Sequence, residues 1–83
     1  MASNLQPEDY FSEAARLETF RKWTKKHPKP SDLASAGLYF EGNKDHVRCA
    51  FCKHVIGNWK DNDRPMIVHE GLFPECPFLR GMN

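Results

Sequence analysis

Apolar residues early in the chain recur at helical spacing, with charged residues between them. This pattern predicts an amphipathic helix over roughly 12–24, which the lysine- and proline-rich stretch 25–30 ends. Ser31 offers an N-cap for a second, short helix over 32–36, and Gly37 closes that helix. The first half of the chain is therefore expected to be mainly helical.

The middle of the chain has the pattern of a small sheet. An aromatic run over Leu38–Phe40 and an alternating run over Val47–Cys49 flank a turn cluster at 42–45, which predicts a hairpin. A third strand is expected over 54–59. Pro65 then suits the first position of a further helix, which runs to about residue 72.

The chain has 83 residues and a net charge of +1. At this length a hydrophobic core alone is marginal, and a bound metal commonly adds the missing stability. We therefore expect a small α+β zinc-stabilised domain, with a short three-stranded antiparallel sheet surrounded by several short helices. The expected division is an N-terminal arm over 1–11, the zinc domain over 12–80 and a C-terminal tail over 81–83.

Charge and hydropathy exclude several classes of partner. The basic residues between 21 and 29 are typical of a solvated face, so no nucleic-acid partner is expected. No apolar run is long enough to span a bilayer, and no membrane partner is expected. The odd number of cysteines and the lack of an apolar export segment favour a reducing, cytoplasmic location.

Four residues have the spacing of a metal site: Cys49, Cys52, His69 and Cys76. Three thiolates and one imidazole fill the tetrahedral shell of a zinc ion and leave no open position for water. The sequence therefore predicts one structural Zn²⁺ and no enzymatic activity. Two alternatives stay open, namely a disulfide with one spare thiol and His54 as a competing ligand.

A larger set of separated positions carries a family resemblance. They are Arg16, Phe20 and Trp23, then 36–42, Asp45, Val47, Cys49 and Cys52, and finally Trp59, Asp63, Pro65, His69, Phe73, Pro74, Cys76 and Phe78. In order and spacing, this set resembles the baculoviral inhibitor-of-apoptosis repeat, the BIR domain, over roughly 12–80. The chain is similar in particular to the first repeat of insect or viral inhibitor-of-apoptosis proteins.

The resemblance implies a peptide-binding groove between the third strand and the helix after it. Such repeats bind free N-terminal Ala peptides of pro-apoptotic antagonists or processed caspases and so inhibit apoptosis. Asp63 stands where the peptide ammonium is received, and the strand backbone can pair with the extended peptide. The groove residues implied here are Val55, Ile56, Gly57, Asn58, Trp59, Asp63, Val68 and Leu72.

Several of these residues also have a plainer structural interpretation. Asp63 could cap the helix that begins at Pro65, and Trp59 could be a core residue. Arg16 resembles the family arginine that bonds buried backbone near the zinc loop, although composition alone favours a solvated helix arginine. Hydrogen-bond donors to the zinc-bound sulfurs are expected from the amides after the first two cysteines and from Arg48 or Lys53.

A second function is implied by Leu72 and Val68. Leu72 stands where peptide-binding repeats often have a bulky aromatic residue or histidine, and Val68 where some have glutamine. Leucine also occurs there in repeats without a working groove, which dock adaptor proteins through their helical faces. A histone-tail reader is a third hypothesis.

We expect a monomer or weak self-association, the latter because removal of Met1 would expose an alanine at residue 2.

Overall fold

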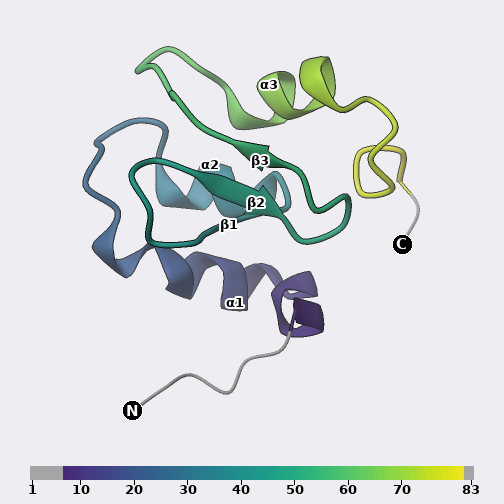
Figure 1. Ribbon diagram of the computed structural model, residues 1–83, viewed down its shortest axis with the longest axis horizontal. Coiled ribbons are helices and arrows are strands. Elements are labelled where there is room, and N and C mark those ends of the chain that lie inside the picture. The colour runs from purple at the N-terminus through teal and green to yellow at the C-terminus, as the bar shows by residue number, and fades with distance from the viewer. Residues whose placement is uncertain (1–6, 82–83) are drawn as a thin grey trace.

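The computed structural model describes residues 7–81 (Figure 1). Short helices surround one small sheet, which confirms the expected α+β class. The elements are the 3-10 helix η1 (Pro7–Phe11), α1 (Glu13–Glu18), the 3-10 helix η2 (Thr19–Lys22), α2 (Pro30–Ser35), β1 (Leu38–Phe40), β2 (Val47–Cys49), β3 (Val55–Ile56) and α3 (Pro65–Leu72). None of the described helices has the length and apolarity needed to cross a membrane.

The sheet is antiparallel in the order β1-β2-β3, so β3 is an edge strand. Leu38 lies opposite Cys49 and Val47 opposite Ile56, and all four side chains are buried on the face that packs against the core. The predicted hairpin is confirmed. The third strand is shorter than the expected span of 54–59, because Asn58 adopts a left-handed φ of 59° that turns the chain out of the sheet.

The helix predicted over 12–24 is not one continuous α-helix in the structure. Its N-cap is Ser12, whose Oγ accepts a hydrogen bond from the amide of Ala15, but the α-helix ends at Glu18 and tightens into η2. The hydroxyl of Thr19 donates to the carbonyl of Arg16 at 2.6 Å and accepts from the amide of Phe40 at 2.8 Å. This bridge to β1 explains why the helix changes its winding there.

The second helix begins one residue before the expected N-cap at Ser31. Its first residue is Pro30, which suits this position because proline has no N–H that needs a partner and its φ is already helical. Gly37 follows the helix with a φ of +87°, and a Cβ there would lie 3.1 Å from the ring of Phe78. Glycine is thus required both by the backbone conformation and by the close packing of that ring.

The N-terminal part of the described chain differs from a free arm. Residues Pro7–Phe11 form η1, the ring of Tyr10 stacks on Tyr39 with centroids 4.2 Å apart, and Phe11 stacks on Phe51 at 5.0 Å. These two aromatic contacts hold η1 against the folded domain. Residues 1–6 and 82–83, and with them the residue-2 alanine, lie outside the described residues, so the expected domain limits stay predictions.

Arg16 is a buried core residue with 2% of its surface exposed, so the solvated interpretation is wrong. Its Nε donates to the carbonyl of Ala34 at 2.8 Å, and its Nη1 donates to the carbonyls of Tyr10 and Phe11 at 2.9 and 3.0 Å. Burial lowers the pKa of Arg16 from its usual value, but these carbonyls hold the charged form. One side chain therefore joins η1, α1 and α2.

The guanidinium also lies near two aromatic rings, with its central carbon 5.6 Å from the centroid of Phe51 and 5.7 Å from that of Phe78. Phe51 lies between Cys49 and Cys52 in the chain, so Arg16 lies beside the cysteine loop as well as on buried backbone. The role that the family resemblance implied for this arginine is confirmed.

Replacing Arg16 by Ala should lower the free energy of unfolding by about 2–4 kcal/mol, because three carbonyls lose a charged donor inside the protein. Chemical denaturation of the zinc-loaded domain measures this. Arg21→Ala is the matched control, since that side chain is 82% exposed and pairs with Glu18 at 3.7 Å on the surface. Its effect should stay within about 0.5 kcal/mol. Equal losses in the two variants would contradict the buried role of Arg16.

Candidate metal centre and peptide site

The four predicted metal donors converge on one point, although they come from separate elements. Cys49 ends β2, Cys52 follows in the next turn, His69 lies on α3, and Cys76 comes after that helix. Their ligand atoms all lie within 4.8 Å of one another. Cys49, His69 and Cys76 are buried and Cys52 is half-buried, so the cluster lies at the edge of the core.

The spacing of these donors fits one zinc ion. Cys49 Sγ lies 3.6 Å from Cys76 Sγ, and Cys52 Sγ lies 3.6 Å from His69 Nε2. Zinc–sulfur bonds of about 2.3 Å and zinc–nitrogen bonds of about 2.0–2.1 Å at tetrahedral angles place donors about 3.6–3.8 Å apart. The donor set is therefore that of a closed, structural site in which no position is left for a reacting water.

A hydrogen bond to backbone fixes the orientation of the His69 ring. Its Nδ1 donates to the carbonyl of Ala36 at 2.9 Å, which leaves the lone pair of Nε2 directed at the cysteines. The ring is fully buried, and burial lowers the pKa of His69, so the imidazole is neutral as a metal ligand must be. This bond also links the end of α2 to the metal site.

Without a bound cation, burial favours the protonated thiols of Cys49 and Cys52. Burial raises the pKa of Cys49 to about 12 in the absence of an ion, against the opposing effect of hydrogen bonds from the amides of Cys52 and Phe51. Burial also raises the pKa of Cys52. A cluster of buried thiolates is thus unfavourable on its own, and a divalent zinc ion supplies the charge that stabilises it.

The expected donors to the sulfurs are only partly the ones observed. The amides of Phe51 and Cys52 donate to Cys49 Sγ at 3.3 and 3.4 Å, as predicted for the residues after that cysteine. Arg48 instead bonds Glu41 and the carbonyl of Lys53, and Lys53 Nζ bonds the carbonyl of Ala50. The two basic side chains therefore stiffen the cysteine loop from outside.

Both alternatives for the cysteines and histidines are wrong. All three cysteines are free, and a sulfur separation of 3.6 Å is far beyond the length of a disulfide, about 2.05 Å. His54 is not one of the clustered donors, because its ring stacks on Phe73 with centroids 3.9 Å apart. Its place beside the C-terminal end of α3 is a packing role.

The expected strand residues of the groove separate into two groups. Ile56 and Trp59 are 4% and 3% exposed and pack in the core, and the buried Nε1–H of Trp59 has no hydrogen-bond partner among residues 7–81. Val55 and Asn58 are exposed and Gly57 is half-buried. Trp59 is therefore a core residue, while its contribution to a groove floor stays a prediction.

The backbone shows which groups of β3 are free to pair. The amide of Cys49 donates to the carbonyl of His54, and Val47 lies opposite Ile56. Since successive residues of a strand direct their polar groups to opposite sides, Val55 directs its N–H and C=O groups to the edge away from β2. Gly57 has a further role, because a Cβ there would lie 2.5 Å from Cδ2 of His46.

Asp63 does not cap α3, so that interpretation is wrong. The N-cap is Arg64, which makes no side-chain capping bond. Asp63 instead closes the turn before the helix: its Oδ2 accepts from the amide of Lys60 at 2.9 Å, and its own amide donates to the Lys60 carbonyl at 3.0 Å. The half-buried carboxylate lines a cavity of about 310 Å³ together with Asp32, Ser35, Arg64, Pro65 and Met66.

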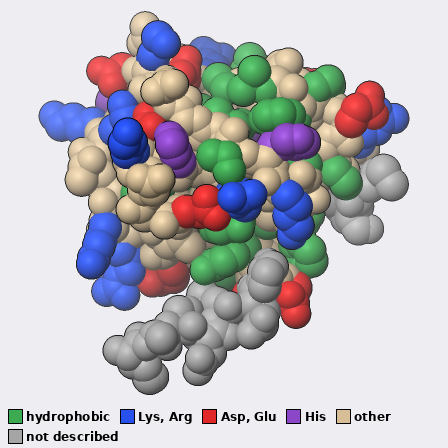
Figure 2. Space-filling view, viewed as in Figure 1, with side chains coloured by type: hydrophobic (Ala, Val, Ile, Leu, Met, Phe, Trp, Pro, Cys, Tyr) green, Lys and Arg blue, Asp and Glu red, His purple; other side chains and the backbone are tan. Residues whose placement is uncertain are grey.

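The two expected groove residues on α3 differ in exposure. Val68 is half-buried against the core, whereas Leu72 is 56% exposed. A second cavity of about 280 Å³ is lined by Leu72 with Cys52, His54, Phe73, Pro74, Glu75 and Cys76. Met66 and Ile67 are also exposed on α3, and hydrophobic side chains gather over this helix (Figure 2).

Sequence reasoning missed two residues that hold the loop after β3. Asp45 appeared only as a motif position and Lys25 only as part of a basic stretch, yet both bond the backbone around Trp59. The one available signal was the motif position of Asp45, two residues before Val47 and four before Cys49. Nothing in the local sequence of Lys25 distinguishes it from its basic neighbours.

His69→Ala should abolish zinc binding and unfold the domain, whereas His54→Ala should keep one zinc per chain. Structural zinc sites contribute about 10–16 kcal/mol of apparent binding free energy in small domains, which exceeds the usual stability of a fold. Metal analysis and far-UV circular dichroism measure both effects, and a strong chelator should reproduce the loss in the unchanged protein. Zinc retained by His69→Ala would contradict the assigned ligand set.

The BIR family model, described as the inhibitor of apoptosis domain, matches residues 16–80. A curated relative, the Apoptosis inhibitor IAP of Cydia pomonella granulosis virus (isolate Mexico/1963), is 42% identical over 71 residues. That match covers 86% of this chain but only 26% of the viral protein, so the chain spans about a quarter of that relative.

Two solved structures are similar over most of their length. The structure of DIAP1 BIR1 bound to a Grim peptide has a TM-score of 0.81 and 38% identity, covering 86% of this chain and 73% of that one. The structure of the autoinhibited dIAP1-BIR1 domain has a TM-score of 0.88 and 34% identity, covering 100% and 79%. The residues matched by the family model include all four clustered metal donors, and the chain belongs to the BIR family of inhibitor-of-apoptosis domains.

Proposed function

We propose that this BIR domain binds extended peptides with a free N-terminal alanine, from pro-apoptotic antagonists or processed caspases, and thereby restrains cell death. The observation that carries the proposal is the similarity to DIAP1 BIR1, which was solved with a Grim peptide. The free edge of β3 and the carboxylate of Asp63 supply the chemistry that such a peptide requires.

The backbone part of the recognition is addition of a strand. Val55 directs its N–H and C=O groups to the free edge, where an extended peptide can pair with them, and we expect Gly57, the residue after β3, to offer its groups to the same peptide. Because β3 has only two residues, few such bonds can form. The backbone therefore supplies alignment, and most of the selectivity comes from the peptide terminus.

The N-terminal ammonium of the peptide would be recognised by an ion pair with Asp63. One oxygen of Asp63 accepts from the amide of Lys60, which fixes the direction of the carboxylate, and the other is available to an ammonium group. The half-burial of Asp63 strengthens such a contact relative to a fully solvated one. An acetylated peptide has no positive charge to offer and leaves the carboxylate without a partner.

A docking function for adaptor proteins is the second candidate, and the apolar surface of α3 favours it. Ile67 is 61% exposed and Leu72 56% exposed, so the helix presents hydrophobic side chains to a partner. A partner bound in this way would not depend on a free peptide terminus. Binding that is unaffected by acetylation but lost in Ile67→Asp would favour this second function.

Asp63→Asn should weaken binding of a short Ala-initiated peptide by about tenfold or more, because the amide keeps the side-chain shape but loses the charge. Calorimetric titration with the free peptide and its N-acetylated twin measures the effect. Asp61→Asn is the matched control, since Asp61 is exposed in the same loop. Zinc content should be unchanged in both. Undiminished affinity in Asp63→Asn would exclude the assigned ammonium site.

A further inference from the structure

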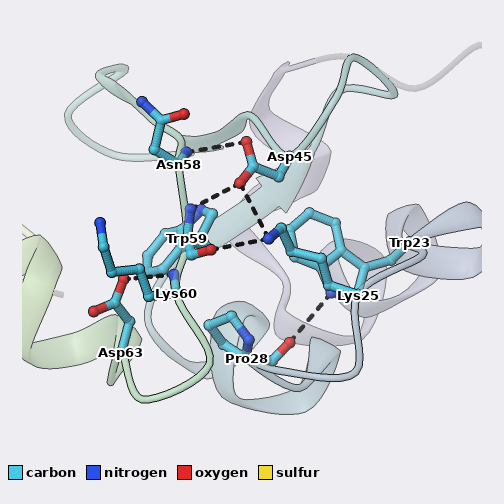
Figure 3. Close-up of polar contacts among 8 residues, drawn as sticks. All are labelled: Trp23, Lys25, Pro28, Asp45, Asn58, Trp59, Lys60 and Asp63. Atoms are coloured by element: carbon cyan, nitrogen blue, oxygen red, sulfur yellow. Dashed lines mark hydrogen bonds and ion pairs between the residues drawn. The ribbon is translucent and has the colours of Figure 1, made fainter.

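The backbone that leaves β3 is held by a carboxylate from another part of the chain. Asp45 lies between β1 and β2, and both of its oxygens bond successive amides beyond β3 (Figure 3). Oδ1 accepts from the amide of Asn58 at 3.0 Å, and Oδ2 accepts from the amide of Trp59 at 2.7 Å. These bonds replace the pairing with β2 that the strand gives up after Ile56.

Lys25 completes the contact from a third direction. Its ammonium donates to the carbonyl of Trp59 at 2.9 Å and lies 3.8 Å from Oδ2 of Asp45 (Figure 3). Both polar groups of the Trp59 backbone are therefore bound by charged side chains. Lys25 and Asp45 are 34 and 14 residues away from Trp59 in the sequence, so they tie separate parts of the fold to one peptide unit.

Asp45 is ionised where it contacts Lys25 and the two amides. The side chain of Asp45 is only 15% exposed. Burial alone would raise the pKa of Asp45, but hydrogen bonds from the amides of Asn58 and Trp59 and the charge of Lys25 hold it below its usual value. The carboxylate is thus ionised at neutral pH, and hydrogen bonds to an ionised acceptor are stronger than neutral ones.

The segment between β3 and α3 determines the geometry of the proposed peptide site. A peptide must reach the edge of β3 with its backbone and Asp63 with its ammonium at the same time. The distance between these two features depends on residues 57–64, which belong to no helix or strand. Two anchors hold this segment, the turn of Lys60 and Asp63 and the contact made by Asp45 and Lys25.

We propose that Asp45 and Lys25 are positioning residues for peptide recognition, which fix Trp59 and the following turn so that Asp63 and the β3 edge are presented at a constant separation. This inference rests on the proposed peptide-binding function. Asn58 turns the chain out of β3 with a left-handed φ of 59°, a conformation that Asn adopts more readily than most residues, and the bond from its amide to Asp45 holds the chain after this turn.

The test combines amide hydrogen exchange with peptide titration of the zinc-loaded domain. Asp45→Asn removes the charge and turns one acceptor into a donor, so the amides of Asn58 and Trp59 should exchange about tenfold faster. Affinity for the free Ala-initiated peptide should fall about tenfold with it. Lys25→Met should lower the affinity about threefold, and Lys25→Arg, which keeps a charged donor, should restore it.

Two matched controls separate positioning from a general loss of stability. Asp61→Asn makes the same chemical change at an exposed aspartate, and Lys26→Met does so at the exposed neighbour of Lys25. Both should leave the exchange rates and the affinity as they are in the unchanged protein. If Asp45→Asn does not fold, the positioning role is tested by Lys25→Met instead. Its affinity for the peptide should be lower than that of both Lys25→Arg and Lys26→Met.

The outcomes distinguish this inference from the function on which it rests. A wild-type domain that does not bind the free peptide overturns the proposed function and the positioning role together. Wild-type binding with unchanged affinity in Asp45→Asn and Lys25→Met overturns the positioning role alone, even where exchange at Asn58 and Trp59 becomes faster. Faster exchange together with weaker binding, rescued by Lys25→Arg, supports it.

Discussion

Convergence of four metal donors from separate chain segments is the constraint on which the rest of this small fold depends. The cluster joins the end of β2, the turn after it, α3 and the segment beyond α3. The bond from His69 to the carbonyl of Ala36 adds α2 to the same point. Strands of two or three residues and helices of two turns bury little surface. The shared metal centre therefore supplies stability that a larger hydrophobic core would provide in a bigger domain.

The sequence was sufficient for features whose cause is local. Ligand spacing identified the zinc donors, and Pro65 identified the start of α3. Features that depend on distant contacts could not be predicted in this way. The change of winding after Glu18 depends on the bridge from Thr19 to Phe40, and the packing of η1 depends on Tyr39 and Phe51, which lie far along the chain.

Buried charges form the second class of features that local patterns miss. Arg16 bonds three carbonyls at or near the ends of η1 and α2, and Asp45 bonds two amides beyond the end of β3. A domain with such short elements has many backbone groups of this kind, and each buried one needs a partner. Charged side chains supply them, which explains why residues that composition assigns to the surface lie inside.

The shortness of β3 connects this architecture to selectivity. A long free edge would pair with many extended peptides, and also with other chains, regardless of their ends. Here the left-handed Asn58 stops the strand after two residues, and Asp45 accepts from the amides of Asn58 and Trp59 in place of further pairing with β2. Backbone pairing alone is then too limited for stable binding. Under the proposed function, a peptide gains enough only when its charged terminus also reaches Asp63, so a short strand favours a free N-terminus over an internal segment.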